Sequence, residues 1–316
     1  MGPRLTTERQ RGWVVPARAL LFIAATVVVL MVSTPLALML PVRPEAAGIG
    51  AFASVATLAL TLLFVRWDGL RLGDAGAAPR RESAGRLLVG FLLGAVLIAV
   101  HSALLSAVGH VEWRRARGVT AGEIAVALAM YLLLSAREEL AFHGYPLRRL
   151  VSVWGVWPAQ AVIAMTFALE HVLGGWSWTN ALSGAAVGSL LFGMAAIATR
   201  GLAVPIGLHA AWNVGDALRG GKDANGVWRA VVAGGFGRSA EIASIVSYLG
   251  LFAVATAGFW WWSRRAASGP GTLGTGRWWP GDAVPPLLEA QPRPAAQLPL
   301  DDLHRHDQEI GEHREV

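Results

Sequence analysis

The chain has no cysteine among its 316 residues. Disulfide bonds, thiolate metal sites and cysteine nucleophiles are therefore excluded. A bound metal would have to use histidine and carboxylate ligands, supported by water, asparagine or backbone oxygen.

Charged residues are scarce as well. They make up 15% of the chain, whereas a soluble domain averages about 25%. Hydrophobic residues make up 54%, and the mean hydropathy is +0.47. This composition predicts an integral membrane protein and argues against one or two soluble domains.

Lysine occurs once, as Lys222, so the basic residues behind the net charge of +6 are nearly all arginines. The arginines lie in short clusters between apolar runs, as expected of loops on the cytoplasmic side of a membrane. Because no domain-sized basic surface is left over, the sequence predicts no nucleic-acid partner.

Apolar runs long enough for a membrane helix, about 20 residues, recur along the chain. They predict an all-α, polytopic transmembrane helix bundle of about eight spans. With eight spans, most arginine clusters fall on one side, which predicts a multi-pass protein of the plasma (inner) membrane with cytoplasmic N- and C-termini. The predicted spans are residues 19–40, 46–65, 86–108, 121–138, 157–173, 180–199, 202–218 and 242–262.

Ionisable residues inside a bilayer are costly, so those in the central spans need a reason. The first group is Glu138, Glu139 and His143, expected at the cytoplasmic end of the span 121–138. Two adjacent carboxylates in a low dielectric cannot both ionise cheaply. Glu139 and His143 are four residues apart and share a helix face. The alternative is that Arg137 pairs with one of the glutamates among the lipid headgroups.

Two further polar groups follow on later spans. Phe167 and His171 are four residues apart, as are His209 and Asn213, so each pair lies on one helix face. Taken alone, these pairs could equally serve helix packing or interhelical hydrogen bonding. Together with the glutamates, they can bind one metal ion or activate one water molecule for hydrolysis.

In this order and spacing, the three groups resemble the CAAX prenyl protease 2 and bacteriocin-processing (CPBP, or abortive-infection) family of intramembrane proteases. That family has the motifs Glu-Glu-x-x-x-Arg, Phe-x-x-x-His and His-x-x-x-Asn on successive membrane helices. The resemblance covers roughly residues 85–262. The motifs read here Glu138-Glu139-Leu140-Ala141-Phe142-His143, Phe167-Ala168-Leu169-Glu170-His171 and His209-Ala210-Ala211-Trp212-Asn213.

The resemblance implies an intramembrane endopeptidase that acts on a membrane-embedded or lipid-associated peptide. Glu138 with His171 would activate the attacking water, and His209 with Asn213 would stabilise the oxyanion. If the enzyme is metal-dependent, Glu138, His171 and His209 would ligate a divalent ion such as zinc; a glutamate mechanism without metal is the alternative. The implied catalytic set is Glu138, Glu139, His171, His209 and Asn213, with His143 and Phe167 in support.

The resemblance also suggests how the chain is divided into segments. Residues 1–18 are predicted to form a cytoplasmic N-terminal segment, residues 19–85 two accessory transmembrane helices, and residues 86–262 the protease core. Residues 263–316 are rich in proline, glycine and charge, which predicts a disordered cytoplasmic tail.

One position departs from the family pattern, because His143 stands where the motif has arginine. Arginine is always charged and can hold a carboxylate in a fixed fork, whereas histidine does so only when protonated or through one donor. His143 is either a working substitute that makes activity pH-dependent or the mark of a non-catalytic membrane scaffold or immunity protein. A transporter with a Glu–His proton relay is a third alternative, but it predicts inverted repeats, and none is evident.

Overall fold

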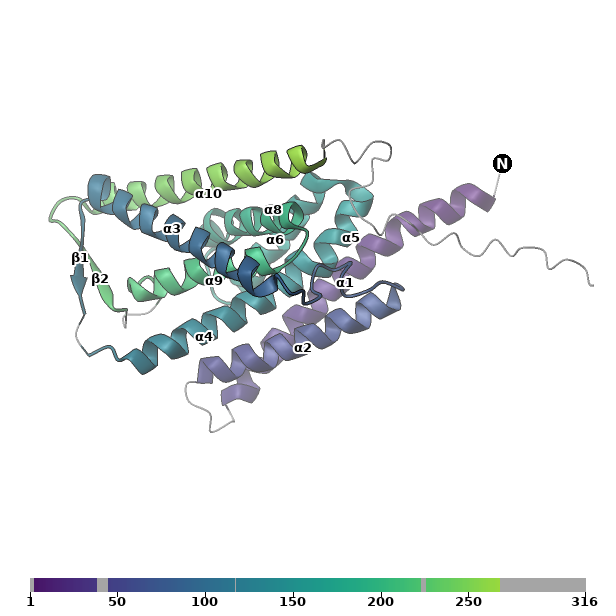
Figure 1. The fold of residues 1–316 in the computed structure, drawn as a ribbon, viewed down its shortest axis with the longest axis horizontal. Helices are drawn as coiled ribbons and strands as arrows, with labels where there is room; N and C mark the ends of the chain where they lie inside the picture. Colours follow the sequence, from purple (N-terminus) through teal and green to yellow (C-terminus); the bar gives the residue numbers. More distant parts are fainter. Residues whose placement is uncertain (1–2, 39–44, 117, 223–225, 268–316) are drawn as a thin grey trace, which may run out of the picture. The chain divides into compact units, whose positions relative to one another are not determined.

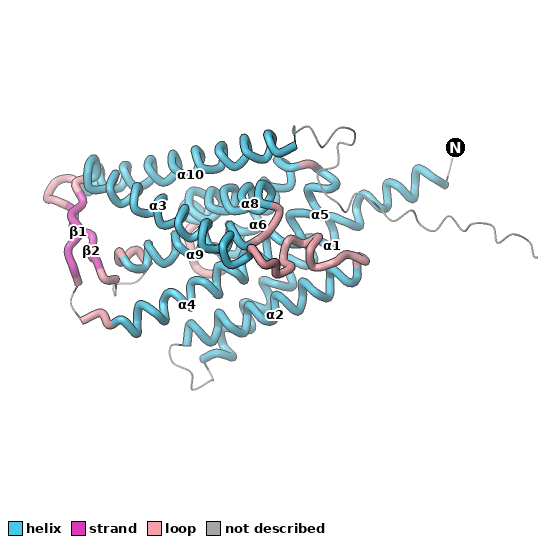
Figure 2. The backbone as a smooth tube through the Cα atoms, viewed as in Figure 1, coloured by secondary structure: helices cyan, strands magenta, loops and turns pink. Residues whose placement is uncertain are grey.

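The computed structural model describes residues 3–38, 45–116, 118–222 and 226–267 (Figure 1). These residues form an almost wholly helical bundle with one short β-ribbon (Figure 2), which confirms the predicted all-α polytopic fold. The α-helices are α1 (Pro3–Leu38), α2 (Glu45–Trp67), α3 (Ser83–Gly109), α4 (Ala121–Glu138), α5 (Tyr145–Trp154), α6 (Val156–Leu173), α7 (Trp178–Asn180), α8 (Val187–Thr199), α9 (Ala203–Leu218) and α10 (Gly237–Ala267). Two π-helical segments are η1 (Glu139–Gly144) and η2 (Ala181–Ala186), and the strands are β1 (Val111–Arg115) and β2 (Trp228–Val232).

Six helical stretches in the described part of the chain are long and apolar enough to cross a membrane. They are Gly12–Ser33, Gly50–Trp67, Ser83–Val108, Val156–Leu173, Trp178–Thr199 and Gly237–Arg265. The expected count of eight is therefore too high by this criterion. The predicted spans 121–138 and 202–218 form α4 and α9, but α4 carries three charged residues and α9 has only 16 residues.

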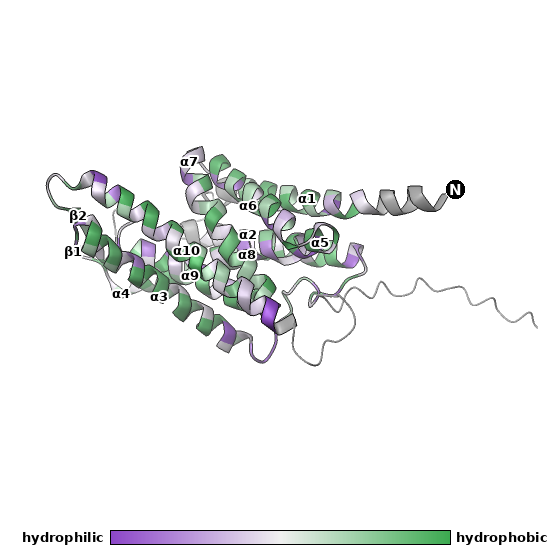
Figure 3. Cartoon of the chain, turned by 90° about the horizontal axis from the view of Figure 1, so that it is seen from above, coloured by the Kyte–Doolittle hydropathy of each residue, from purple (hydrophilic) through white to green (hydrophobic). Residues whose placement is uncertain are grey.

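Hydrophobic residues cover most of the helical surface, and hydrophilic ones gather near helix ends and loops (Figure 3). Large apolar side chains such as Leu92 and Val96 of α3 and Val254 of α10 are more than half exposed. Such a surface suits contact with lipid chains. The polar side chains that are buried lie mainly on α4, η1, α6 and α9.

Helix α9 lies inside the bundle, in contact with α3, α4 and α8 (Figure 1). Glycines allow its close approach to α3. A Cβ atom on Gly90 would lie 2.1 Å from the carbonyl oxygen of Val204, and one on Gly207 would lie 2.0 Å from that of Leu87. Small residues that let two backbones approach are typical of membrane helix pairs. This contact fixes the helix that carries His209 and Asn213.

The end helices are longer than predicted. Helix α1 begins at Pro3 and so includes part of the expected N-terminal segment. Helix α10 runs from Gly237 to Ala267, so the tail boundary expected at residue 263 is wrong by five residues. The added residues at the end of α10 are Ser-Arg-Arg-Ala-Ala; alanine and arginine favour a helix, although this stretch is not apolar enough to belong to a predicted span. The remainder of the predicted tail, 268–316, lies outside the described residues.

The β-ribbon was not predicted. Strands β1 and β2 pair antiparallel, with Val111 opposite Val232 and Arg115 opposite Trp228. They join the connection after α3 to the connection before α10. Their five-residue segments are too short and too charged to stand out from the helical pattern of the sequence.

The glutamate pair lies at the end of α4, as expected, because α4 ends at Glu138. The π-helical segment η1 follows directly, and the backbone of Gly144, with φ −81° and ψ −117°, separates it from α5. Pro146 lies in the first turn of α5, where its missing N–H leaves no hydrogen bond unmade. Single π-helical segments inside helices often occur at functional sites. The wide turn of η1 carries Glu139 and His143 in the interior of the bundle, where both side chains are 0% exposed.

Candidate active site

Glu139 is held by two histidines from different helices. Its Oε2 atom lies 2.8 Å from Nδ1 of His143, and its Oε1 atom lies 2.9 Å from Nδ1 of His209. A carboxylate has no proton to give, so both imidazoles donate from Nδ1. Glu139 therefore orients both rings, and His209 reaches it from 70 residues away.

His209 lies between the two glutamates. While Nδ1 faces Glu139, Nε2 lies 3.3 Å from Oε2 of Glu138. The contact between Nε2 and Glu138 is a hydrogen bond when one of the two groups carries a proton. Either Nε2–H donates to the carboxylate of Glu138, or a protonated Glu138 donates to Nε2. The ring of Phe192 stacks on His209, with centroids 4.2 Å apart and planes inclined by 15°. These contacts fix the plane of the imidazole.

His143 also makes two contacts. Its Nε2 atom lies 3.0 Å from the hydroxyl oxygen of Ser189 in α8. A neutral ring with its proton on Nδ1 donates to Glu139 and accepts from Ser189, so both contacts are made without a positive charge. No motif pointed to Ser189, which the sequence shows only as a small residue among glycines. It is found only because α8 packs against η1.

His171 is oriented by its own helix. Its Nδ1 atom lies 3.0 Å from the carbonyl oxygen of Phe167, which fixes the proton on Nδ1 and leaves the lone pair on Nε2. The ring packs against Phe167 and Trp176, with centroid separations of 4.6 and 4.8 Å. Phe167 thus contacts His171 through both its ring and its carbonyl oxygen, and His171 keeps the form in which it can act as a base.

A cavity of about 540 Å³ brings the second and third motifs together. Phe167, His171, His209 and Asn213 all line it. The amide nitrogen of Asn213 lies 3.5 Å from the hydroxyl of Ser135, a long contact that leaves its other N–H able to face a ligand. Glu138 is not among the residues that line the cavity, but it contacts His209, which does line it, and keeps 10% of its side chain exposed. Other lining residues include His101, Trp176, Asn180, Asp216, Arg219 and Tyr248.

Arg137 pairs with the second motif and not with the neighbouring glutamates. Its guanidinium makes a two-pronged contact with Glu170, with Nη2 to Oε2 at 2.8 Å, and it donates to the backbone carbonyl of Thr26 at 3.0 Å. Both charged side chains are at most 4% exposed. The alternative of an Arg137–glutamate pair among lipid headgroups is therefore wrong. The pair instead joins α4 to α6, directly before Glu138 and His171.

The metal ligands implied by the resemblance are Glu138, His171 and His209. Among the described residues, no group of three or more histidine, aspartate or glutamate side chains is arranged to hold a metal ion. Of Glu138, His171 and His209, the contact between Glu138 and His209 is the one observed. As placed here, these residues do not form the compact tetrahedral set that zinc uses. The steps proposed below therefore involve no metal.

Residues 120–215 match the family model of the type II CAAX prenyl endopeptidase Rce1-like proteins. The match begins at Thr120, the residue that caps α4, and ends two residues after Asn213. It thus contains all three motifs, with Glu138, Glu139, His143, His171, Ser189, His209 and Asn213, whereas some residues that line the cavity, such as His101 and Tyr248, lie outside it. A search of curated proteins found no match. The motifs and this match together support membership of the CPBP family, to which the Rce1-like endopeptidases belong.

Proposed function

We propose that this chain is an intramembrane endopeptidase that hydrolyses a membrane-associated peptide by glutamate-assisted attack of water. The placement of His209 between Glu138 and Glu139, at the edge of a cavity shared with His171 and Asn213, is the observation that carries the proposal. A protease needs a base near a water, a group that fixes the base, and donors for the oxyanion. The family match points to the same class of activity.

In the proposed reaction, Glu138 and His171 hold a water molecule in the cavity. Glu138 takes a proton from this water as its oxygen attacks the carbonyl carbon of the peptide bond. The carbonyl oxygen becomes an oxyanion, which accepts hydrogen bonds from Nε2–H of His209 and the amide of Asn213. Glu138 then passes the proton to the peptide nitrogen, and the C–N bond breaks to release an amine and a carboxylic acid.

Glu139, His143 and Ser189 serve this reaction indirectly. Glu139 accepts from Nδ1–H of His209 and so keeps Nε2 directed toward Glu138 and the cavity. His143, supported by Ser189, holds the second oxygen of Glu139. They are positioning residues because their contacts run through His209 and not to the cavity itself.

Part of the cavity lining suits a hydrophobic peptide segment. Its lining includes the apolar or aromatic side chains of Trp176, Trp212, Tyr248 and Leu249. It lies at the ends of α3 and α9 remote from Arg86 and Arg200. If the arginine-rich connections are cytoplasmic, as the positive-inside rule predicts for a plasma-membrane protein with cytoplasmic termini, the substrate enters from the opposite face. The cleaved bond would then lie in, or just outside, the non-cytoplasmic half of the bilayer.

The test is cleavage of a panel of quenched hydrophobic peptides by the purified full chain in detergent. Glu138→Gln and His209→Ala are expected to lower kcat by about 10²-fold or more. Glu112→Gln is a matched control, because Glu112 is an exposed glutamate of β1 and should leave the rate unchanged. Equal cleavage rates in wild type and Glu138→Gln would contradict the proposal. A chelator added to each sample separates a glutamate mechanism from a metal-dependent one.

A non-catalytic membrane scaffold or immunity protein of the same fold is the second candidate function. His143 at the position of the motif arginine is the observation that favours it. This function predicts no cleavage of any peptide and a cellular phenotype that survives Glu138→Gln. Loss of that phenotype in Glu138→Gln, with normal expression, would instead favour the protease.

A further inference from the structure

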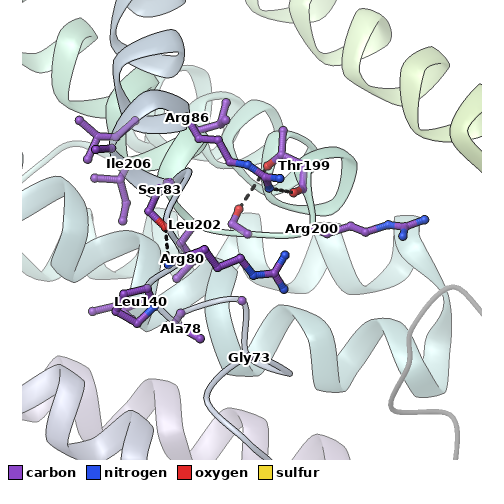
Figure 4. A pocket seen from close by; sticks show the side chains of 18 of the residues that line it. Gly73, Ala78, Arg80, Ser83, Arg86, Leu140, Thr199, Arg200, Leu202 and Ile206 are labelled. Atoms are coloured by element: carbon purple, nitrogen blue, oxygen red, sulfur yellow. Dashed lines mark hydrogen bonds between the residues drawn. The ribbon is translucent and has the colours of Figure 1, made fainter.

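A second cavity lies at the opposite end of the bundle from the proposed active site. It has a volume of about 380 Å³ and is formed by the turn at residues 73–80, the first turns of α3 and the connection between α8 and α9 (Figure 4). Three arginines line it, namely Arg80, Arg86 and Arg200. None of the described residues that line it is a carboxylate. The cavity therefore carries a net positive charge and favours an anion.

Two of these arginines extend toward the same loop. In Figure 4, the side chains of Arg80 and Arg86 both point toward the connection that contains Thr199 and Arg200. Arg86 is fixed there, because its Nη1 atom donates to the carbonyl oxygen of Thr199 at 3.2 Å. Ser83 holds the backbone of Arg80 through a 2.9 Å hydrogen bond. The fold thus positions the guanidinium of Arg86 and the backbone of Arg80. The side chain of Arg200 extends away from these two arginines in Figure 4.

A fourth arginine adds positive charge behind the cavity wall. Arg148 of α5 is 6% exposed, and its guanidinium packs so closely on Gly76 that a Cβ atom there would lie 2.1 Å from Nη2. Gly76 itself lines the cavity. Burial, followed by the neighbouring charge of Arg80, lowers the pKa of Arg148 to about 10, although Asp74 acts in the opposite direction. An anion in the cavity would relieve this repulsion.

The other side of the cavity is apolar. Leu58, Leu87, Leu140, Val204 and Ile206 line it, from α2, α3, η1 and α9. A small soluble anion gains nothing from contact with such an apolar surface, whereas an amphiphile can bury its hydrocarbon chain against it.

Tryptophans place this end of the bundle near a membrane surface. Trp67 ends α2, directly before the turn that forms the cavity, and the guanidinium of Arg18 lies 4.5 Å from its ring. Trp260 and Arg264 make a similar contact at 5.2 Å near the end of α10. Tryptophan and arginine near helix ends are typical of the headgroup region. The charged part of the cavity is thus expected at the depth of lipid phosphates.

We propose that this cavity binds an anionic phospholipid, with the phosphate between Arg80 and Arg86 and an acyl chain against Leu58, Leu87 and Val204. Basic pockets between membrane helices recognise anionic headgroups in this way. The site is separate from the catalytic residues, and the proposal does not depend on the proposed protease activity.

Native mass spectrometry of the purified full chain, released from nanodiscs of mixed phosphatidylcholine and phosphatidylglycerol, tests the site. Wild type is expected to retain phosphatidylglycerol in preference to phosphatidylcholine. Arg80→Gln and Arg86→Gln are each expected to lower the retained phosphatidylglycerol by about fivefold. Arg81→Gln is the matched control, because Arg81 is exposed and adjacent but lies outside the cavity lining. Ala84→Trp, which fills the cavity from the first turn of α3 without a change of charge, should also lower retention.

Each alternative result would overturn the proposal. Equal retention of the two lipids by wild type would show no anion preference. An equal loss in Arg81→Gln would show a diffuse surface charge and not a site. Displacement of the lipid by inorganic phosphate at low concentration would show that the cavity takes a soluble anion. Unchanged retention in Ala84→Trp would show that the lipid lies elsewhere.

Discussion

Nδ1 of His143 lies 2.8 Å from Oε2 of Glu139, one helical turn earlier in the chain. The resembled motif has arginine at this position, which would give several donors and a permanent charge. His143 gives one donor to Glu139, and Ser189 occupies its other nitrogen. The neutral ring satisfies both contacts, so the geometry itself requires no change of protonation at this position.

Restoring the motif arginine is therefore not expected to improve the site by itself. Both His143 and Glu139 are 0% exposed, and a longer side chain at position 143 would collide with α8. Overpacking of this kind costs about 1–3 kcal/mol. We expect His143→Arg to lower thermal stability, and His143→Arg with Ser189→Gly to recover part of it. A more stable and more active single variant would contradict this prediction and favour a protonation switch at His143.

Asn213 provides a second prediction. As an oxyanion donor, it acts on the transition state more than on the bound peptide, so Asn213→Ala should lower kcat by about 10²-fold with little change in KM. Asn213→Asp should be no better, because it replaces donors with negative charge. Ser135→Ala removes only the long 3.5 Å contact to Asn213 and serves as the control. An unchanged kcat in Asn213→Ala would exclude the oxyanion role.

The buried Arg137–Glu170 pair predicts that removal of one charge destabilises the protein more than removal of both. Arg137→Leu leaves Glu170 buried without its partner and should destabilise the protein by about 3–5 kcal/mol. Arg137→Leu combined with Glu170→Leu removes both charges and should lose much less. The measurement is thermal unfolding in detergent.

The exposed pair Arg114–Glu112, with both side chains more than 60% exposed, offers a matched comparison. Arg114→Ala should lower the free energy of unfolding by at most about 1 kcal/mol. If Arg137→Leu costs no more than Arg114→Ala, the buried pair does not stabilise the junction of α4 and α6.

The hydrogen bonds at the start of α4 predict that the stability of its first turn depends on pH. Thr120 and Glu123 form a capping box, with the Thr120 N–H donating to Glu123 Oε2 at 2.8 Å. The hydrogen bonds from the backbone and hydroxyl of Thr120 lower the pKa of Glu123 below its ordinary value of 4.5. A lowered carboxyl pKa stabilises the folded state above the ordinary value, and this contribution is lost as pH falls through the folded-state pKa.

Hydrogen exchange of the amides in residues 121–124 measures this effect. Protection should fall between about pH 5 and pH 3 in wild type. Glu123→Gln should remove the pH dependence over that range while the rest of α4 keeps its protection. A fall of equal size in Glu123→Gln would assign the effect to another group.

Sequence reasoning predicted much of the architecture correctly, because hydropathy depends on local composition. The helical class, six of the spans and the i, i+4 pairs Glu139–His143 and Phe167–His171 follow from periodicity along single helices. Two of the eight predicted spans, 121–138 and 202–218, form α4 and α9 but fall outside the length and composition criterion, because α4 carries three charged residues and α9 has only 16 residues. Nine of the residues of α9 are buried, and a buried helix need not be as apolar or as long as one that faces lipid.

The sequence by itself determined which side chains can do chemistry and which pairs share a helix face. The tertiary structure alone decided that His209 bridges two glutamates, that Arg137 pairs with Glu170, and that Ser189 supports His143. Each of these contacts joins residues at least 33 positions apart. Such contacts depend on how helices pack, here on the glycine-lined approach of α3 to α9 and on the wide turn at η1. No periodicity within one helix encodes them.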